Sequence, residues 1–278
     1  MDEGERILVF GRGGWLGQAL WRRLQSSGRD AAGPTRTEVD IRSPEPLERA
    51  LHTVRPSSVI NLAAARPGAD EDTLEAVNVV GARNVAAACA RLGLRLVHVS
   101  TDALHDGRSA PYGDAAPANP LTPYGRSKAC GETAVLEVHP EAVCVRTSLI
   151  WDAQAMDRGT RGFAGRIAAG EPCVLYSDEI RCPLPRDTLA EALLDLTRLD
   201  VAGPLNVAGR EALSRYDFGL LLLRHFDVSG LDAIRRVRAA DLVEAGQPPR
   251  PRDLRLLVDQ AEALLGRTLP GVTDVLRR

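Results

Sequence analysis

The stretch ILVFGRGGWLGQAL, residues 7–20, joins a short apolar run to a helical pattern through spaced glycines. Ile7–Phe10 is typical of a buried strand, and residues 16–24 have apolar side chains at helical spacing. Between them, Gly11, Gly14 and Gly17 provide for a tight turn, a close backbone approach to a ligand, and close packing of helix on strand. The N–H groups that open a helix favour anions. The stretch therefore predicts a site for the diphosphate of a dinucleotide.

The rest of the chain repeats this alternation of strand and helix. Further buried strands are expected at 59–65, 94–100, 142–150 and 203–209, and a helix at 74–92. Continuous apolar strands between helices predict a parallel sheet covered on both faces, in a doubly wound α/β (Rossmann) fold. We expect residues 1–150 to form a dinucleotide-binding domain. Residues 151–278 are expected to form a smaller, mainly helical substrate-binding lobe, from which the chain returns to the sheet near 187–209.

The composition is that of an ordinary globular protein. The 278 residues are 44% hydrophobic and 26% charged, and the formal net charge of -2 gives no reason to expect nucleic acid as a partner. The five cysteines are odd in number and have no C-x-x-C spacing, so we expect reduced thiols and no metal. The acidic N-terminus does not read as a signal peptide, and no apolar run reaches the roughly 18 residues of a membrane helix. A cytoplasmic protein without a membrane partner is expected.

The segment after the glycine motif bears on the choice of dinucleotide. A carboxylate about 20 residues beyond the glycines favours NAD, whereas an arginine there can bind the 2′-phosphate of NADP. Arg36 is present and no acidic residue ends an obvious strand, so the sequence leans towards NADPH over NADH. An exposed loop arginine without a ligand is the alternative.

After the glycine motif, Tyr124 and Lys128 are the second group of residues that predicts a function. Four residues apart on a helix, their side chains share one face. An ammonium beside a phenol lowers the phenol pKa from about 10, so that tyrosine can exchange a proton with a reacting oxygen. The pair follows Ser100 and Thr101, whose hydroxyls end an expected strand. The pattern predicts a carbonyl-binding site that works with the dinucleotide.

Together these stretches resemble the extended branch of the short-chain dehydrogenase/reductase superfamily, and within it the dTDP-4-dehydrorhamnose reductase family of sugar-nucleotide reductases. The similarity runs along nearly the whole chain. It is carried by GRGGWLGQAL at 11–20, VINLAAA at 59–65, VSTDALHDG at 99–107, PLTPYGRSKACGE at 120–132, VRTSLI at 145–150 and PRPRDLRL at 249–256.

The resemblance implies roles for individual residues. Thr101 would orient the substrate carbonyl, Tyr124 would protonate it, and Lys128 would hold the nicotinamide ribose. The other implied cofactor-binding residues are Gly11, Gly14, Trp15, Leu16, Gly17, Arg36, Asp40, Ile41, Ala63, Ala64, Ala65 and Asn78. Besides Thr101, the expected substrate-binding residues are His105, Trp151 and Arg252. The implied reaction is NAD(P)H-dependent reduction of a nucleotide-linked keto-sugar, such as a dTDP-4-keto-6-deoxyhexose. A homodimer is left open.

The chain also departs from the family pattern. Ala103 follows Thr-Asp where an aromatic residue is usual, and Leu149 stands where tryptophan is common. Ala65 and Arg66 occupy the region in which a tyrosine or similar residue often follows an Ala-Ala pair. The absence of glutamate at position 103 removes the base that sugar dehydratases use. Three alternatives to the keto-sugar reductase stay open: a non-catalytic NADP-binding regulatory subunit, a sugar epimerase, and a reductase of a small ketone.

Overall fold

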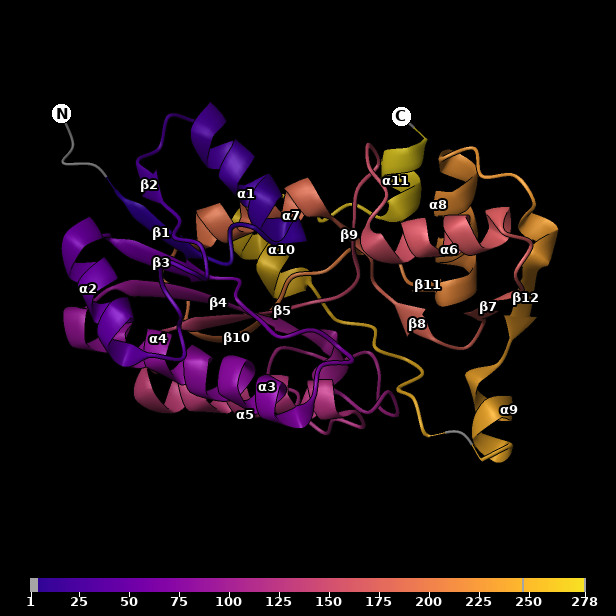
Figure 1. Ribbon diagram of the computed structural model, residues 1–278, viewed down its shortest axis with the longest axis horizontal. Coiled ribbons are helices and arrows are strands. Elements are labelled where there is room, and N and C mark those ends of the chain that lie inside the picture. Colours follow the sequence, from indigo (N-terminus) through magenta and orange to yellow (C-terminus); the bar gives the residue numbers. More distant parts are fainter. Residues whose placement is uncertain (1–4, 247, 278) are drawn as a thin grey trace.

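A six-stranded parallel sheet forms the centre of the larger part of the molecule (Figure 1). The computed structural model describes residues 5–246 and 248–277. Its strand order is β10-β5-β4-β3-β1-β2, and every neighbouring pair is parallel. The strands are β1 (Ile7–Phe10), β2 (Ala31–Ala32), β3 (Ser58–Asn61), β4 (Arg95–Thr101), β5 (Val143–Thr147) and β10 (Gly203–Asn206). The expected doubly wound fold is confirmed, and its strand order reverses between β1 and β3.

Helices cover both faces of this sheet (Figure 1). One face carries α1 (Trp15–Ser26), α7 (Arg186–Leu196) and α10 (Asp259–Leu265), and the other carries α2 (Pro44–Val54), α4 (Ala82–Leu92) and α5 (Pro123–Val138). In α1 the buried side chains include Leu16, Ala19, Leu20 and Leu24, which recur at helical spacing and face the sheet. Two separate hydrophobic clusters, one on each face, result.

The helix expected at 74–92 is present but is not uniform. Its first turn is α3 (Glu71–Leu74), Glu75–Gly81 has π-helical geometry, and α4 completes it. The wider turn brings the carbonyl of Asn78 so close to α5 that a Cβ on Gly131 would stand 2.0 Å from it. Helical periodicity alone does not reveal such a turn, which is frequent at functional sites.

The strand expected at 59–65 is shorter than predicted. β3 ends at Asn61, whose side-chain oxygen accepts the N–H of Ala63 at 3.1 Å and turns the chain out of the sheet. Similarly, the strand expected at 142–150 divides into β5 and β6 (Ile150–Trp151). The apolar runs continue past the strands because the loops that follow also line or cover the interior.

The smaller lobe contains α6 (Arg158–Ala168), β7 (Cys173–Tyr176), β8 (Ile180–Arg181), β11 (Leu213–Ser214), α8 (Arg215–His225), β12 (Ile234–Val237), α9 (Ala239–Glu244) and α11 (Val272–Leu276) (Figure 1). β12 pairs with β7, so the region after 215 is less helical than expected. β6 pairs with β9 (Leu184–Pro185), and α7 and β10 then return to the large sheet, near the segment expected. A second return was not expected: Leu254, Val258 and Leu269 are buried in the same cluster as α1 and α7.

Candidate active site

The reversal of strand order places a large groove at the carboxyl ends of β1 and β3, which is where ligands bind in this class of fold. Gly11 follows β1 with a φ of +85°, and a Cβ there would lie 2.8 Å from the backbone of Ala63. Gly17 lies one turn into α1, where a Cβ would be 2.3 Å from the carbonyl oxygen of Gly11. Gly14 opens α1 at the N-cap. The glycines therefore bring the start of α1 against β1 and leave its N–H groups facing the groove.

The groove gathers most of the residues expected to bind the dinucleotide. Eleven of them line it: Gly11, Gly14, Trp15, Leu16, Gly17, Arg36, Asp40, Ile41, Ala63, Ala64 and Ala65. Tyr124 and Lys128, which are also expected to bind the cofactor, are not among the residues that line it, and neither is Asn78. Its buried side chain accepts the N–H of Ala65 at 2.8 Å and donates to the Ser127 hydroxyl at 2.9 Å. Asn78 therefore connects the groove wall to α5.

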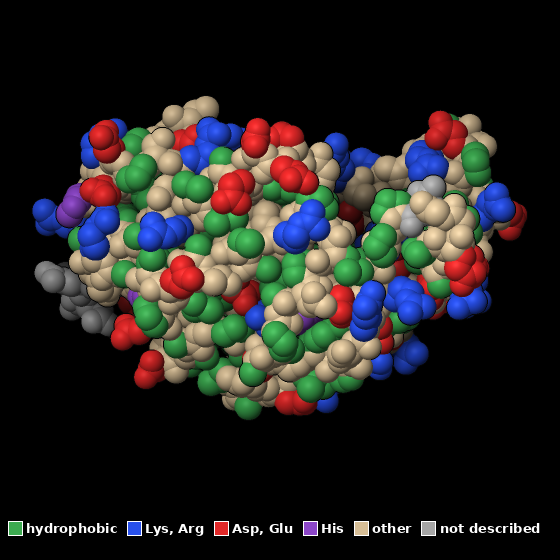
Figure 2. All heavy atoms as spheres, turned by 90° about the horizontal axis from the view of Figure 1, so that it is seen from below, with side chains coloured by type: hydrophobic (Ala, Val, Ile, Leu, Met, Phe, Trp, Pro, Cys, Tyr) green, Lys and Arg blue, Asp and Glu red, His purple; other side chains and the backbone are tan. Residues whose placement is uncertain are grey.

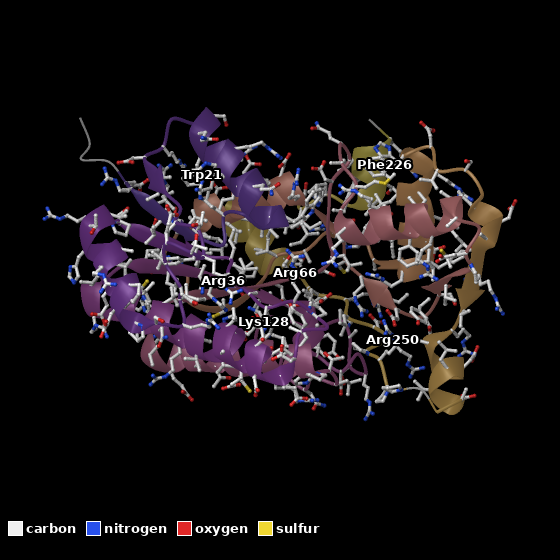
Figure 3. All side chains as sticks on the ribbon, viewed as in Figure 1. Trp21, Arg36, Arg66, Lys128, Phe226 and Arg250 are labelled. Atoms are coloured by element: carbon white, nitrogen blue, oxygen red, sulfur yellow. The ribbon has the colours of Figure 1, made fainter. Side chains whose placement is uncertain are left out.

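Five arginines line the same groove: Arg12, Arg36, Arg66, Arg158 and Arg161. Arg36 and Arg66 lie near the middle of the molecule in Figure 3. Arg158 and Arg161 are exposed residues of α6, so the smaller lobe also borders the groove. The one carboxylate of the lining, Asp40, accepts hydrogen bonds from Arg42, which keep its pKa below the usual range. A groove with this charge suits a polyanion.

Arg12 is a cation that the sequence analysis did not single out. Its guanidinium lies 5.1 Å from the ring centre of Trp21, and its stem fills the space that a Cβ on Gly33 would take. The Nε atom of Arg12 is buried and has no hydrogen-bond partner among the described residues. The signal was present in the sequence, because Arg12 lies inside the glycine motif itself.

α5 carries Tyr124 and Lys128 past the carboxyl end of β4. The helix begins at Pro123 after the N-cap Thr122, whose hydroxyl accepts the N–H of Gly125 at 3.0 Å. Thr101 ends β4, and its hydroxyl accepts the N–H of Ala103 at 3.2 Å, donates to Asp102 at 3.3 Å, and lies near enough to the Tyr124 phenol to lower its pKa. The structure thus brings together Thr101 and Tyr124 as the sequence predicts, with Lys128 one turn further along the helix.

The prediction that Lys128 lowers the pKa of the Tyr124 phenol is wrong for this geometry. Burial, followed by the nearby Asp102 carboxylate, raises the pKa of Tyr124 to about 12, and the Thr101 hydrogen bond only partly opposes this. The Lys128 ammonium instead donates to the carbonyl of Val99 at 2.8 Å. Its own pKa is lowered to about 8, chiefly by burial. Tyr124 therefore keeps its proton near neutral pH.

Asp102 lies beneath the Thr101–Tyr124 pair and is buried. It accepts a hydrogen bond from Ser148 at 2.6 Å, and the guanidinium of Arg181 stands 3.9 Å away. Burial raises the pKa of Asp102, while Arg181 and Ser148 act in the opposite direction. Asp102 holds the end of β4 to β5 and the smaller lobe.

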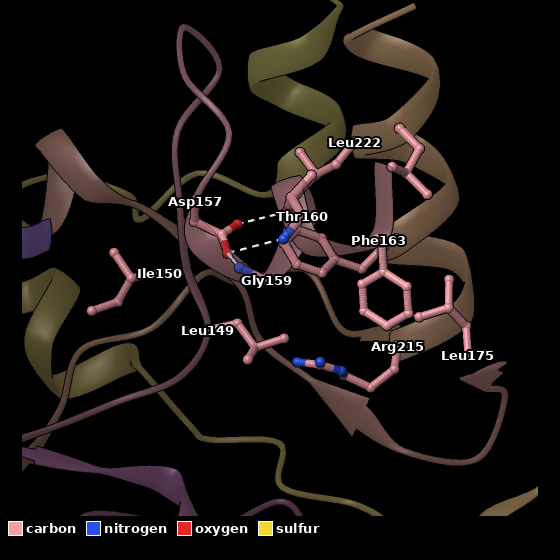
Figure 4. Close-up of a pocket in the computed structure, with 12 residues that line it drawn as sticks. Leu149, Ile150, Asp157, Gly159, Thr160, Phe163, Leu175, Arg215 and Leu222 are labelled. Carbon is pink, nitrogen blue, oxygen red and sulfur yellow. Dashed lines mark hydrogen bonds between the residues drawn. The ribbon is translucent and has the colours of Figure 1, made fainter. Parts of the chain in front are cut away.

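A second cavity lies within the smaller lobe and shares Ile150 with the groove. Its wall is mainly apolar, and Figure 4 shows the guanidinium of Arg215, the first residue of α8, reaching towards Leu149. Asp157 caps α6 at the edge of this cavity by accepting the N–H groups of Gly159 and Thr160. The cavity therefore joins an apolar wall to one strong hydrogen-bond donor.

Arg215 belongs to a group of three arginines with Arg181 and Arg250. Burial lowers the pKa of Arg215, and repulsion from Arg181 adds to this effect. The buried carboxylate of Glu179 pairs with Arg250 and stands 4.0 Å from Arg181. Because the group sets three guanidinium ions against the carboxyls of Glu179 and Asp102 alone, it retains positive charge that an anion can neutralise.

None of the four expected substrate-binding residues, which are Thr101, His105, Trp151 and Arg252, lines either cavity. His105 is buried, stacked on Tyr112 with ring centres 3.9 Å apart, and burial lowers its pKa to about 4. Trp151 is fully buried and meets Phe218 edge to face in the core of the smaller lobe. The side chain of Arg252 is exposed, while its carbonyl accepts the N–H of Ile180.

None of the helices in residues 5–246 and 248–277 is both long and apolar enough to cross a membrane. Within those residues, no cluster of histidine, cysteine and carboxylate side chains suits a metal ion. Figure 2 shows acidic and basic side chains interspersed over one face of the molecule.

Comparisons with known proteins agree with this architecture. The family described as "RmlD substrate binding domain" matches residues 5–277. A dTDP-4-dehydrorhamnose reductase of Mycobacterium tuberculosis is 36% identical over 258 residues, covering 89% of this chain and 82% of that protein. The Haloferax volcanii protein named "Probable low-salt glycan biosynthesis reductase Agl14" is 30% identical, covering 96% of this chain and 95% of that one. A crystal structure of dTDP-4-dehydrorhamnose reductase from Bacillus anthracis, in complex with NADP, superposes with a TM-score of 0.87 at 23% identity, covering 100% and 98% of the two chains.

Proposed function

The chain belongs to the RmlD substrate binding domain family, and from this membership we propose that it is an NAD(P)H-dependent reductase of a nucleotide-linked keto-sugar. The relatives that carry the proposal are named as reductases, the first of them as a dTDP-4-dehydrorhamnose reductase. A dTDP-4-keto-6-deoxyhexose is the substrate that this name suggests. The observation that supports it best is the Thr101–Tyr124 pair beside the arginine-lined groove.

The groove fits a dinucleotide on three counts. The N–H groups at the start of α1 suit the diphosphate, the glycines leave room for it, and the unpartnered Nε of Arg12 suits a further phosphate. Arg12 and Arg36 lie on the side of the groove formed by the segment after β2, where the ribose of the adenosine half would lie. We therefore favour NADPH, whose 2′-phosphate would engage both arginines.

The dinucleotide supplies the hydride, and the chain's residues position the substrate and move the proton. Thr101 donates a hydrogen bond to the substrate carbonyl, which orients it and polarises the bond. Tyr124 donates its proton to the same oxygen as the carbonyl is reduced to an alcohol. Lys128 would hold the sugar hydroxyls of the cofactor. Ala63–Ala65 and Val99 exclude water from the reacting centre.

The cavity of the smaller lobe suits the remainder of the substrate. Its apolar wall can cover a nucleobase or a deoxysugar, and Arg215 can pair with a diphosphate oxygen. Arg215→Met should therefore raise the KM for the nucleotide sugar about 10-fold or more, the loss expected for one charge-assisted hydrogen bond. The Kd for NADPH should not change.

Turnover with a panel of nucleotide keto-sugars tests the proposal. Purified protein is mixed with NADPH, and cofactor oxidation is followed at fixed substrate concentrations. Oxidation that depends on a keto-sugar and is lost in Tyr124→Phe supports the reductase. Tight NADPH binding with no oxidation by any keto-sugar would favour the regulatory subunit, for which Ala103 and Leu149 are the suggestive departures. Oxidation by small ketones alone would favour the small-ketone reductase.

A further inference from the structure

Lys128 is the only lysine among the 278 residues; the other 34 of the 35 basic side chains are arginine. It is also among the most buried polar residues, with 2% of its surface exposed. An ammonium in that position is costly unless hydrogen-bond acceptors surround it. The immediate surroundings of its Nζ atom therefore decide at which pH it loses its proton.

A row of side chains leads from the groove to this lysine. Asn61 and His98 are paired neighbours on β3 and β4, each about 1% exposed. The Asn61 amide lies 3.2 Å from His98 Nδ1, and His98 Nε2 lies 3.5 Å from Lys128 Nζ. At the other end of the row is Ala63, which lines the groove and donates its N–H to the oxygen of Asn61.

The hydrogen-bond roles along this row follow from Ala63. Its N–H can donate only to the amide oxygen of Asn61, so the amide nitrogen of Asn61 faces His98 and must be the donor there. His98 Nδ1 then accepts, which leaves the ring proton on Nε2. That N–H faces Lys128 Nζ. An ammonium there would set one hydrogen-bond donor against another, whereas the lone pair of a neutral amine would accept the N–H.

We propose that Asn61 and His98 are positioning residues that present an N–H to Lys128 and thereby favour the neutral amine of the chain's only lysine. The row therefore links the protonation of Lys128 to the turn at Ala63, which lines the dinucleotide groove. This inference goes beyond the proposed function and rests on it only for the consequence in turnover.

The other groups facing Lys128 do not reverse this effect. Cys144, beside His98 on β5, is a buried thiol whose pKa is raised by burial, so it stays neutral. Glu132, one turn further along α5, accepts three hydrogen bonds from Arg146. Tyr124 keeps its proton. The lowered pKa of Lys128, about 8, agrees with a site that weakens the ammonium, and the pKa of His98 is lowered by burial and by Lys128.

A single lysine allows a direct test, because lysine labelled with ¹³C gives side-chain signals from Lys128 alone. The titration midpoint of the folded protein is measured by NMR without substrate or cofactor, and Lys128→Met identifies the signal. We expect a midpoint near 8. In His98→Gln the amide can turn its oxygen towards the ammonium, so the midpoint should rise by about one unit or more, the shift that one hydrogen bond to a charged group produces.

His139→Gln is the matched control. His139 is also buried, and its Nε2 bonds the carbonyl of Leu94 at the far end of α5, away from the site. The control should leave the Lys128 midpoint in place. If the Lys128 midpoint rises no more in His98→Gln than in His139→Gln, the proposal is overturned.

A second measurement uses the unaltered chain and does not depend on a variant's folding. ¹⁵N-histidine spectra report which ring nitrogen of His98 carries the proton; we expect Nε2, and a proton on Nδ1 would refute the row. The ammonium is the form that donates to the sugar hydroxyls of the cofactor. If the native midpoint is near 8, turnover should therefore fall as pH rises through that value, and His98→Gln should move this fall to higher pH. NMR results that differ from these expectations overturn this inference, whereas an absence of turnover bears on the proposed function alone.

Discussion

Replacing Arg12 with methionine should weaken the proposed preference of the chain for NADPH over NADH. The arginine stem runs past Gly33 and its guanidinium covers Trp21, so the unbranched methionine can keep most of this packing. What is lost is the charge and its N–H donors. The substitution therefore isolates the interaction with a phosphate from the shape of the groove.

The expected size follows from the surroundings of the guanidinium. A hydrogen bond to a charged group contributes roughly 1.5–3 kcal/mol, and Arg12 is partly exposed, so the lower end applies. The Kd for NADPH should rise about 10-fold, while the Kd for NADH should change less than about threefold because NADH has no 2′-phosphate. The difference between the cofactors should shrink at high salt.

The assay is cofactor binding by fluorescence or calorimetry, with NADPH and NADH side by side. Arg36→Met should give the same selective loss. Arg22→Met is the control, because Arg22 lies on α1 and pairs with Asp187 outside the groove. Equal weakening of both cofactors by Arg12→Met, or a native preference for NADH, would refute the assignment of Arg12 to the 2′-phosphate.

Three further outcomes are expected. Gly17→Ala places a Cβ 2.3 Å from a backbone oxygen and should lower both the melting temperature and NADPH affinity. Gly113→Ala, whose Cβ meets nothing within 4 Å and lies outside the groove, should change neither, and parallel melting and binding curves compare the two. Glu132→Gln should leave the Arg146 charge buried without its partner, and the free energy of unfolding should fall by about 3 kcal/mol. A urea titration measures this change, and a loss under about 1 kcal/mol would contradict the prediction. Lys128→Met should weaken NADPH binding and turnover together, and undiminished affinity would show that the lysine does not hold the cofactor.

The sequence predicted the parts of the site that depend on local pattern. The glycine spacing between a strand and a helix predicted the groove, since turn geometry and helix start are encoded within a few residues. The Tyr124–Lys128 spacing likewise predicted their shared helix face. Both predictions needed no knowledge of what packs against them.

Contacts between distant segments account for what the sequence did not reveal. Arg12 turns towards the segment after β2 because Gly33 leaves space there, and Trp151 is buried because Phe218 packs against it. His105 follows the active-site strand in sequence, yet stacking on Tyr112 withdraws it from both cavities. The rise in the Tyr124 pKa depends on burial, which the helix face alone does not report.

The most direct test of the reductase mechanism is the turnover of Tyr124→Phe with the true keto-sugar substrate. The substitution removes one hydroxyl, keeps the ring, and leaves Thr101 and Lys128 in place. Loss of a general acid predicts a kcat lower by about 100-fold or more, with the Kd for NADPH nearly unchanged. Because the Tyr124 phenol keeps its proton up to a pKa of about 12, this loss should be the same at pH 6 and pH 8. A variant that reduces the substrate at the native rate would show that Tyr124 is not the proton donor.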